Sequence, residues 1–473
     1  MSRHRLITGC LLAAIFSWFC WLRREAGYGD GPGSLLVLRR DAIWESGNHL
    51  LFLPLLWAWL KVLGSDRLTD FRLAGAFCAL TVTVGLGFFN AALRRMGVTP
   101  RRAALATILT AFYPATLFFA TAVELHALMF MTCGMSFYVA GRVTTQGGAF
   151  WHMAFVFCLV LCYGAHATAH LWAVTLVAFF ALTADETASA RSRWLQGLAH
   201  LGAYGAVTLL ALPLLRHTLG SQATSDGPAR FLITTAQKAL ENPASLPPTV
   251  INEYFVAYLP ASFVVLFLCW RRESRRPACI VSVAAAVYAL ISWLLLSGAR
   301  EHGAYLLPLA MLFSVAILTW ARTWVLAALT VVTMIWGSVY VKIYDNPEAS
   351  TMYADACRRF AAERPITLIV GDGLDISVAV VELPDVDIVL APTLMTIPCA
   401  DLLPELSKHV DALLSSGHAV YLTKGAVLLL RNPAALSLPC ASEIVDHILE
   451  DYTTRWIADG PFEAYEIVAA RHR

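Results

Sequence analysis

An aspartate in a glycine-rich stretch is the first residue of this chain whose setting is typical of catalysis. Asp30 stands within YGDGPG, residues 28–33, and glycine tolerates unusual backbone angles that let a chain approach a ligand closely. A carboxylate held there can act as a general base toward an acceptor hydroxyl or amine. Aspartate and glycine are also the usual residues of a plain turn, so both interpretations stay open.

The next stretch, RRDAIWESGNH in residues 39–49, crowds charged and aromatic residues beside an apolar segment. Glu45, Asn48 and His49 are candidates to contact a polar ligand held over a membrane surface. The alternative is that the charges of this stretch pair with one another at the membrane interface.

Glu124 stands near the start of an otherwise apolar run that reads ATAVELHAL over residues 120–128. Ionisable groups at membrane depth are costly, so a functional role is the default hypothesis for Glu124. We assign it to the catalytic residues, with His126 as a substrate contact on a different helix face, since residues two apart do not face each other. A glutamate that rests at the membrane interface is the alternative.

Two further pairs carry ionisable groups at the ends of apolar runs. His166 and His170 are four residues apart, a spacing that puts both on one helix face and can bind a metal. No third ligand is evident, so we expect them to contact substrate or to be structural. Arg300 and His302 lie in a very short connection, where the guanidinium suits a phosphate group or anchors the chain at the interface.

The composition places these residues in a membrane protein. Of the 473 residues, 58% are apolar and 14% are charged, and the mean hydropathy is +0.62. Soluble domains are about 45–50% apolar and about 25% charged. A soluble enzyme, a disordered protein and a nucleic-acid-binding module are therefore excluded.

Apolar stretches of the length that a bilayer requires predict eleven spans. They cover residues 6–22, 73–93, 103–120, 121–141, 150–164, 167–183, 197–215, 254–270, 278–297, 303–320 and 323–343. All arginine-rich loops fall on the cytoplasmic side, as positive residues prefer, if residues 48–64 form an interfacial or re-entrant helix. The N-terminus is then cytoplasmic, and the long loops 23–72 and 216–253 face outward from the inner (plasma) membrane.

Residues 344–473 are expected to form an acidic, soluble domain outside the cytoplasm. They hold 19 acidic and 9 basic residues, which leaves 14 and 26 before them. Strand-like runs alternate with helical patterns, which is typical of a small α/β domain. The expected strands are 366–370, 386–390, 419–422, 427–430 and 465–469, and the expected helices are 351–363, 401–416 and 441–456. Cys357, Cys399 and Cys440 would allow one disulfide in that compartment.

The sequence resembles the GT-C superfamily of polyprenyl-phosphate-dependent membrane glycosyltransferases, and looks closest to its bacterial protein O-mannosyltransferase-like branch. Asp30 falls where that family has an acidic residue in the first outer loop, and residues 47–54 (GNHLLFLP) where it has a His-Pro-rich helix. Residues 123–128 (VELHAL) are similar to its Glu-Val-Tyr helix start. Residues 163–168 (YGAHAT) are similar to its Gly-x-His-x-Thr turn, and residues 300–308 to its Arg-Tyr-x-x-x-Pro helix start.

The resemblance implies a fold and an activity. The fold would be a polytopic α-helical membrane domain of about 11 transmembrane helices, residues 1–343, followed by a soluble α/β domain, residues 344–473. The enzyme would move a hexosyl or pentosyl group from a polyprenyl-phosphate donor to an acceptor protein, lipid or glycan at the outer face, with inversion. Asp30 would be the base and Arg300 would bind the phosphate. No certain cofactor is implied, and nothing in the sequence supports a divalent metal.

Two other functions fit a polytopic chain. A transporter or lipid flippase often shows repeated halves with broken helices and ionisable residues near the middle of the membrane. Here the candidate residues gather at one face, and no repeat is visible. A noncatalytic scaffold of envelope assembly would keep the same fold without the activity.

Overall fold

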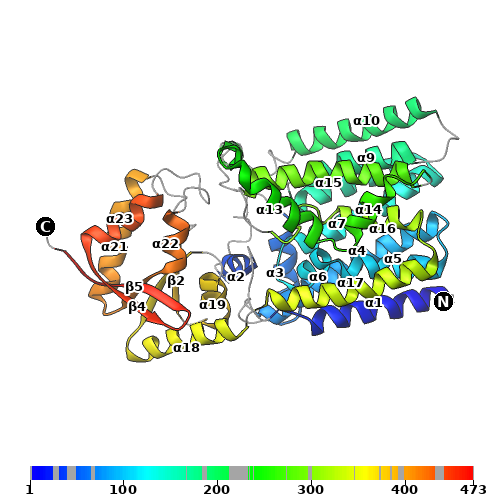
Figure 1. The fold of residues 1–473 in the computed structure, drawn as a ribbon. Helices are drawn as coiled ribbons and strands as arrows, with labels where there is room; N and C mark the ends of the chain where they lie inside the picture. Colours follow the sequence, from blue (N-terminus) through cyan, green and yellow to red (C-terminus); the bar gives the residue numbers. More distant parts are fainter. Residues whose placement is uncertain are drawn as a thin grey trace.

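The computed structural model consists of a helical bundle with an α/β unit at one end (Figure 1). The N-terminus lies at the bundle end away from the α/β unit. The structure describes residues 3–24, 31–39, 50–64, 70–166, 168–183, 189–211, 233, 235–237, 239–272, 274–296, 301–345, 347–371, 374–383, 386–391, 399–431 and 441–471. Five candidate residues lie outside these ranges, namely Asp30, Glu45, Asn48, His49 and Arg300.

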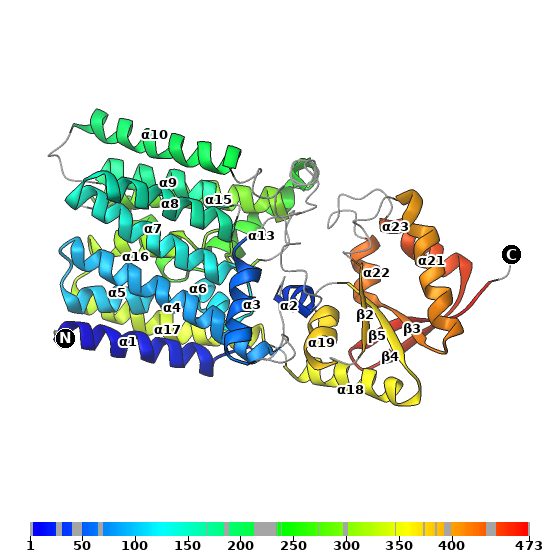
Figure 2. The same ribbon diagram turned by 180° about the vertical axis from the view of Figure 1, so that it is seen from behind.

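The bundle contains helices that run along a common direction (Figures 1 and 2). Their bounds are α1 (Arg3–Trp21), α4 (Phe71–Arg95), α5 (Pro100–Phe112), α6 (Pro114–Thr121), α7 (His126–Gln146), α8 (Ala149–Ala165), α9 (Ala169–Thr183), α10 (Ala190–Ala206), α14 (Ala261–Leu268), α15 (Arg275–Leu296), α16 (Leu309–Leu318) and α17 (Thr323–Ile343). In the described part of the chain, 3 helices are long and apolar enough to cross a membrane, or up to 5 if each bent pair is one span. Shorter apolar helices occupy several other predicted spans, so the count of eleven stays a prediction.

Two predicted straight spans are broken. The first, residues 103–120, bends by 68° between α5 and α6, because proline at 114 disfavours the helical conformation of the residue before it. The second, residues 254–270, bends by 95° between the helical run Pro243–Val256 and α14. That run consists of η2 (Pro243–Ser245), α13 (Leu246–Val250) and η3 (Ile251–Val256). Pro260 stands at this second break and has no N–H to continue a helix.

Two short helices lie at the end of the bundle that faces the α/β unit. Figure 2 shows α3 (Phe52–Val62) lying across the bundle end, with α2 (Gly31–Arg39) beside it toward the α/β unit. Leu56 and Leu60 of α3 are buried, and Trp59 Nε1 of α3 donates to the carbonyl oxygen of Leu73 at 2.8 Å. The interfacial or re-entrant helix expected at residues 48–64 therefore corresponds to α3, which does not run along the other helices.

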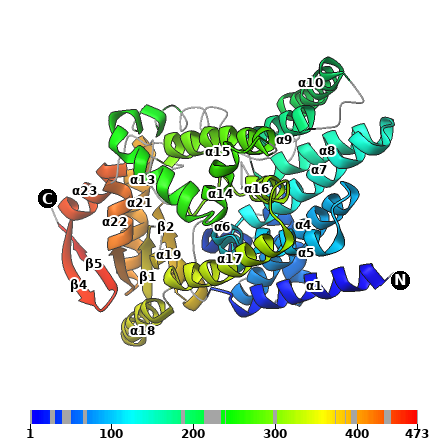
Figure 3. The same cartoon turned by 45° about the vertical axis from the view of Figure 1, so that its right-hand side comes forward.

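The α/β unit is built on a five-stranded sheet with strand order β2-β1-β3-β5-β4. The strands are β1 (Ile366–Val370), β2 (Asp387–Leu390), β3 (Ala419–Thr423), β4 (Tyr452–Asp459) and β5 (Phe462–Ala470). β1 pairs in parallel with β2 and β3, whereas β5 pairs antiparallel with β3 and β4. Its helices are α18 (Pro347–Glu363), α19 (Leu374–Glu382), α21 (Cys399–Ser415), α22 (Lys424–Arg431) and α23 (Ala441–Asp451). Figure 3 shows β1 and β2 on the side toward the bundle.

The sequence located the buried strands and missed the exposed one. Every residue of β1 and β3 is buried, so both strands read as short apolar runs. The prediction of a helix over 441–456 is wrong at its end, because β4 begins at Tyr452 and lies at the sheet edge. The prediction of a strand over 427–430 is also wrong, because these residues belong to α22. A short apolar run fits either element, and Thr423 Oγ1 accepts from the Ala426 N–H at 3.2 Å at the start of this helix.

Of the three cysteines that could form the predicted disulfide, the structure describes the side chain of Cys357. Cys357 is a free, fully buried thiol on α18. The side chains of Cys399 and Cys440 lie outside the described part of the chain.

Helix α2 joins the two parts of the molecule. Its Leu35 and Leu38 are fully buried and belong to a continuous apolar core that extends from the bundle to one face of the sheet. A Cβ added at Gly33 of α2 would lie 3.8 Å from Ile376 Cδ1 of α19, an ordinary contact distance. The α/β unit is therefore docked on the segment that directly follows Asp30 in sequence.

Candidate functional site

A turn between α6 and α7 sets the position of Glu124. Ala122 is extended and α7 begins only at His126, so Glu124 precedes the helix. The backbone N–H of Glu124 donates to Cys78 Sγ of α4 at 3.5 Å, and Cys78 Sγ donates to the Glu124 carbonyl oxygen at 3.6 Å. The backbone groups of Glu124 thus find partners on α4, which explains why the helix predicted from residue 121 starts later.

Glu124 and His126 form a buried pair. His126 Nδ1 donates to Glu124 Oε1 at 3.2 Å, and their side chains are 8% and 4% exposed. The prediction that the two side chains point to different faces is wrong, because it assumed that both residues are helical. The carboxylate instead orients the imidazole ring and fixes which nitrogen faces it.

His166 and Tyr305 complete this cluster, which we call the Glu124 cluster (Glu124, His126, His166 and Tyr305). The ring centres of His126 and His166 are 4.7 Å apart, and the Tyr305 ring centre lies 6.2 and 6.0 Å from them. The backbone N–H of Thr168 donates to His166 Nδ1 at 3.2 Å. The neutral His166 ring therefore carries its proton on Nε2.

His166 and His170 do not share a helix face. His166 is the extended residue that ends α8, and His170 lies in the first turn of α9. His170 Nδ1 is 2.8 Å from the Tyr204 hydroxyl, and its ring centre is 4.7 Å from that of Tyr163. The interpretation as a helical pair is wrong, because α8 ends at Ala165 and α9 begins only at Ala169. His170 belongs to a separate contact between α9 and α10.

His302 belongs to a third group, together with an arginine that the sequence analysis missed. The His302 ring stacks on Phe118 at 4.1 Å, and its Nδ1 is 2.7 Å from the Tyr340 hydroxyl. The Arg24 guanidinium carbon lies 4.6 Å from the centre of the same Phe118 ring, and Arg24 donates to the carbonyl oxygen of Tyr344. Arg24 follows the first span on the predicted outer side, where positive residues are disfavoured, and that exception was the available signal.

Asp30 and His49 lie outside the described residues, but residues close to them in sequence contact the chain beside the Glu124 cluster. Gly31, which is bonded to Asp30, packs so tightly that an added Cβ would lie 1.8 Å from the carbonyl oxygen of Val123, the residue before Glu124. Leu51, two residues after His49, donates its N–H to the carbonyl oxygen of Gly164 at 3.0 Å, two residues before His166.

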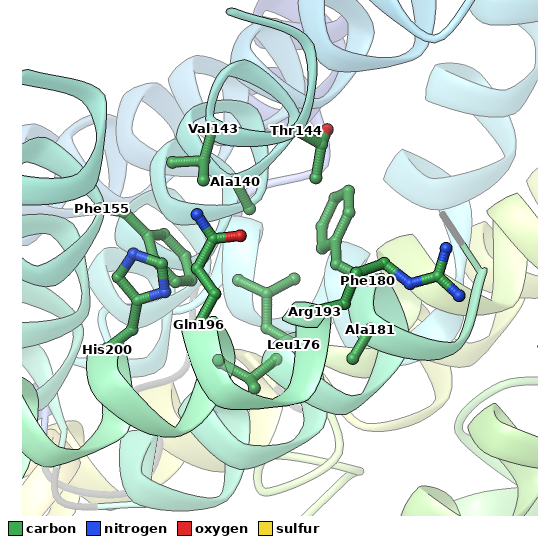
Figure 4. Close-up of a pocket in the computed structure, with 12 residues that line it drawn as sticks. Ala140, Val143, Thr144, Phe155, Leu176, Phe180, Ala181, Arg193, Gln196 and His200 are labelled. Carbon is green, nitrogen blue, oxygen red and sulfur yellow. The ribbon is translucent and has the colours of Figure 1, made fainter. Parts of the chain in front are cut away.

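The structure indicates no metal centre in the described part of the chain, where no group of three or more His, Cys, Asp or Glu residues could hold an ion. Figure 4 shows a pocket between α7, α9 and α10, lined in part by Thr144, Arg193 and His200. The residues that line this pocket include none of the candidate residues that the structure describes. The pocket is therefore not the site that the candidate residues define.

Comparison with known proteins supplies the class of fold. No protein-family model matches the chain, and no curated protein matches it either. Among solved structures, ArnT from Cupriavidus metallidurans in the apo state is similar, with a TM-score of 0.57, 13% identity and 98% of each chain covered. ArnT bound to undecaprenyl phosphate gives a TM-score of 0.54 at 13% identity, again with 98% of each chain covered. A mycobacterial arabinofuranosyltransferase, AftD, gives a TM-score of 0.46 at 12% identity, and the match covers 100% of this chain and 42% of AftD.

The chain shares the fold of ArnT over almost the whole of both chains. The helices that are long and apolar enough to cross a bilayer make the chain a membrane protein. At 13% identity the likeness concerns the fold, and the activity is argued separately below.

Proposed function

We propose that this protein is a membrane glycosyltransferase that moves a sugar from a polyprenyl-phosphate donor to an acceptor at the outer face of the membrane. One observation carries the proposal. The bundle end that faces the α/β unit gathers the Glu124 cluster together with Gly31 and Leu51, the described neighbours of Asp30 and His49. A fold like that of ArnT, which has been solved with undecaprenyl phosphate bound, supports a lipid-linked donor.

The proposed mechanism is a single displacement with inversion. The acceptor oxygen or nitrogen attacks the anomeric carbon, the bond from that carbon to the phosphate oxygen breaks, and polyprenyl phosphate leaves. Asp30 takes the acceptor proton as general base. Arg300 neutralises the charge that develops on the phosphate, since cations placed where charge develops stabilise the transition state.

The other candidate residues have supporting roles in this proposal. Glu124 acts through His126, whose ring it orients, and His166 lies against that ring. Glu45, Asn48 and His49 contact the polar part of the donor or acceptor. His302 holds the turn that follows Arg300, and His170 is structural.

The proposed topology places the N-terminus in the cytoplasm of a cell whose inner membrane holds the protein. Residues 1–343 form the catalytic membrane domain, and residues 344–473 form the outer α/β domain that selects the acceptor. The contact between α2 and α19 supports this role, since α2 directly follows Asp30 in sequence.

Sugar transfer from a defined donor tests the proposal. Purified full-length protein is incubated with a panel of radiolabelled hexosyl and pentosyl polyprenyl phosphates, and transfer to cell-envelope acceptors is measured. We expect the wild type to use at least one donor and Asp30→Asn to lose turnover while remaining folded. Glu241→Gln, an exposed acid in the same predicted outer region, is the matched control and is expected to keep full turnover.

The rival functions predict different outcomes. A lipid flippase would move the labelled lipid across proteoliposomes without cleaving its sugar. A scaffold would neither cleave nor move it. The proposal fails if no labelled sugar is released from any donor by protein that is shown to be folded.

A further inference from the structure

Glu253 is a buried carboxylate at the end of the predicted outer loop 216–253, and the proposed mechanism gives it no role. It lies in η3, and its side chain is completely buried. Its Oε1 accepts the Glu301 N–H at 2.9 Å, and its Oε2 accepts the Gly303 N–H at 2.6 Å. One carboxylate therefore binds two backbone amides of the same turn. Such charge-assisted hydrogen bonds are about twice as strong as neutral ones.

The turn that Glu253 binds has an unusual backbone. His302 has a φ of 53° and Gly303 a φ of 80°, both in the left-handed region. That region disfavours residues other than glycine, so His302 must be held in this conformation by the contacts around it. The Tyr258 hydroxyl donates to the Gly303 carbonyl oxygen at 2.8 Å, which holds the next peptide unit, between Gly303 and Ala304.

The anchored turn continues directly to Tyr305. The Ala304 N–H donates to the Glu301 carbonyl oxygen at 3.0 Å, and the Leu306 N–H donates to that of Gly303 at 3.1 Å. These consecutive bonds leave little freedom between the Glu253 carboxylate and Tyr305, whose ring lies against His126 and His166.

We propose that Glu253 is a positioning residue that sets Tyr305 against the two histidines of the Glu124 cluster, and so shapes the binding site for the donor phosphate. This inference rests on the proposed function. An ionised carboxylate suits the task because it only accepts hydrogen bonds. A glutamine amide has one oxygen and would turn an NH₂ donor toward one of the two N–H groups.

Binding of undecaprenyl phosphate to purified full-length protein tests the inference. We expect Glu253→Gln to weaken binding by about ten- to a hundredfold, the range for losing a hydrogen bond to a charged group. Glu253→Asp keeps the charge and is expected to recover part of the affinity, while Glu241→Gln binds as the wild type does. Hydrogen exchange of residues 301–306 should quicken most in Glu253→Gln, less in Glu253→Asp and not at all in Glu241→Gln.

A double-mutant cycle separates positioning from general stability. If Glu253 acts through Tyr305, Glu253→Gln/Tyr305→Ala binds no more weakly than Tyr305→Ala, whereas independent effects would add. Additive losses, or wild-type affinity in Glu253→Gln, would overturn the inference. If the wild type itself binds no undecaprenyl phosphate, the proposed function fails with it. Should Glu253→Gln not fold, the cycle is run with Glu253→Asp.

Discussion

Replacement of Gly31 by alanine tests the contact that joins the Asp30 segment to the Glu124 turn. The new Cβ would lie 1.8 Å from the Val123 carbonyl oxygen, 2.8 Å from its carbonyl carbon and 3.1 Å from its Cβ. Ordinary contact begins at 3.4 Å, so the two backbones must separate by about 3.4 − 1.8 = 1.6 Å. The two nearest Val123 atoms, its carbonyl oxygen and carbon, belong to the backbone, so no side-chain rotation can relieve the overlap.

The expected result is a protein that folds but turns over poorly. Overpacking of this kind costs about 1–3 kcal/mol of stability, which a protein of this size tolerates. A misplacement of about 1 Å near reacting groups can cost about a hundredfold in rate. We therefore expect Gly31→Ala to lose about a hundredfold or more in sugar transfer from the radiolabelled donor that the wild type uses.

Gly33→Ala is the matched control, because it makes the same change two residues later in α2. Its Cβ would lie 3.8 Å from Ile376 Cδ1, an ordinary contact. Alanine also suits a helix better than glycine by about 0.5–1 kcal/mol, so this variant should keep its turnover and unfold at a slightly higher temperature. Wild-type turnover in folded Gly31→Ala would refute the reasoning. Equal losses of turnover in both variants would mean that any change in α2 lowers turnover, and not the overlap at Gly31 in particular.

Four further outcomes are expected. Arg300→Ala should weaken use of the donor by about 2–5 kcal/mol, as for truncating one partner of a buried charge pair. Arg300→Lys should recover only part of this loss, since the point charge of an ammonium does not replace the planar fork of guanidinium donors. Equal donor affinity in the wild type and both variants would contradict the role of Arg300 in phosphate binding. Burial raises the pKa of the Cys357 thiol to about 12, so it stays protonated in the folded protein at pH 8 and should alkylate far more slowly than in urea, as mass spectrometry can measure. The same shift predicts that folded-state stability falls as pH rises above about 8.5, where the unfolded thiol ionises, and that Cys357→Ala has a weaker alkaline decline. A reporter fused after Arg473 should be active only outside the cytoplasm, and a cytoplasmic signal would overturn the topology.

Much of the secondary structure could be predicted from local pattern alone. The observed α17 agrees with the predicted span 323–343 at both ends, and β1 with the predicted strand 366–370. Both are continuous apolar segments whose burial depends on composition more than on particular partners. Breaks within apolar runs were missed, because the bends at Tyr113 and Pro260 leave the hydropathy of the run unchanged.

The sequence by itself determined that this is a membrane protein with an α/β unit after its helices, and it selected Glu124, His126 and His166 as residues of interest. Only the tertiary structure decided which of these residues meet. Glu124 faces His126 because a turn, held by Cys78 of a distant helix, replaces the expected helix start. Such meetings depend on contacts between residues far apart in sequence, and local periodicity carries no information about them. For the same reason only the fold could show that Glu253 binds the turn at Gly303, fifty residues further along the chain.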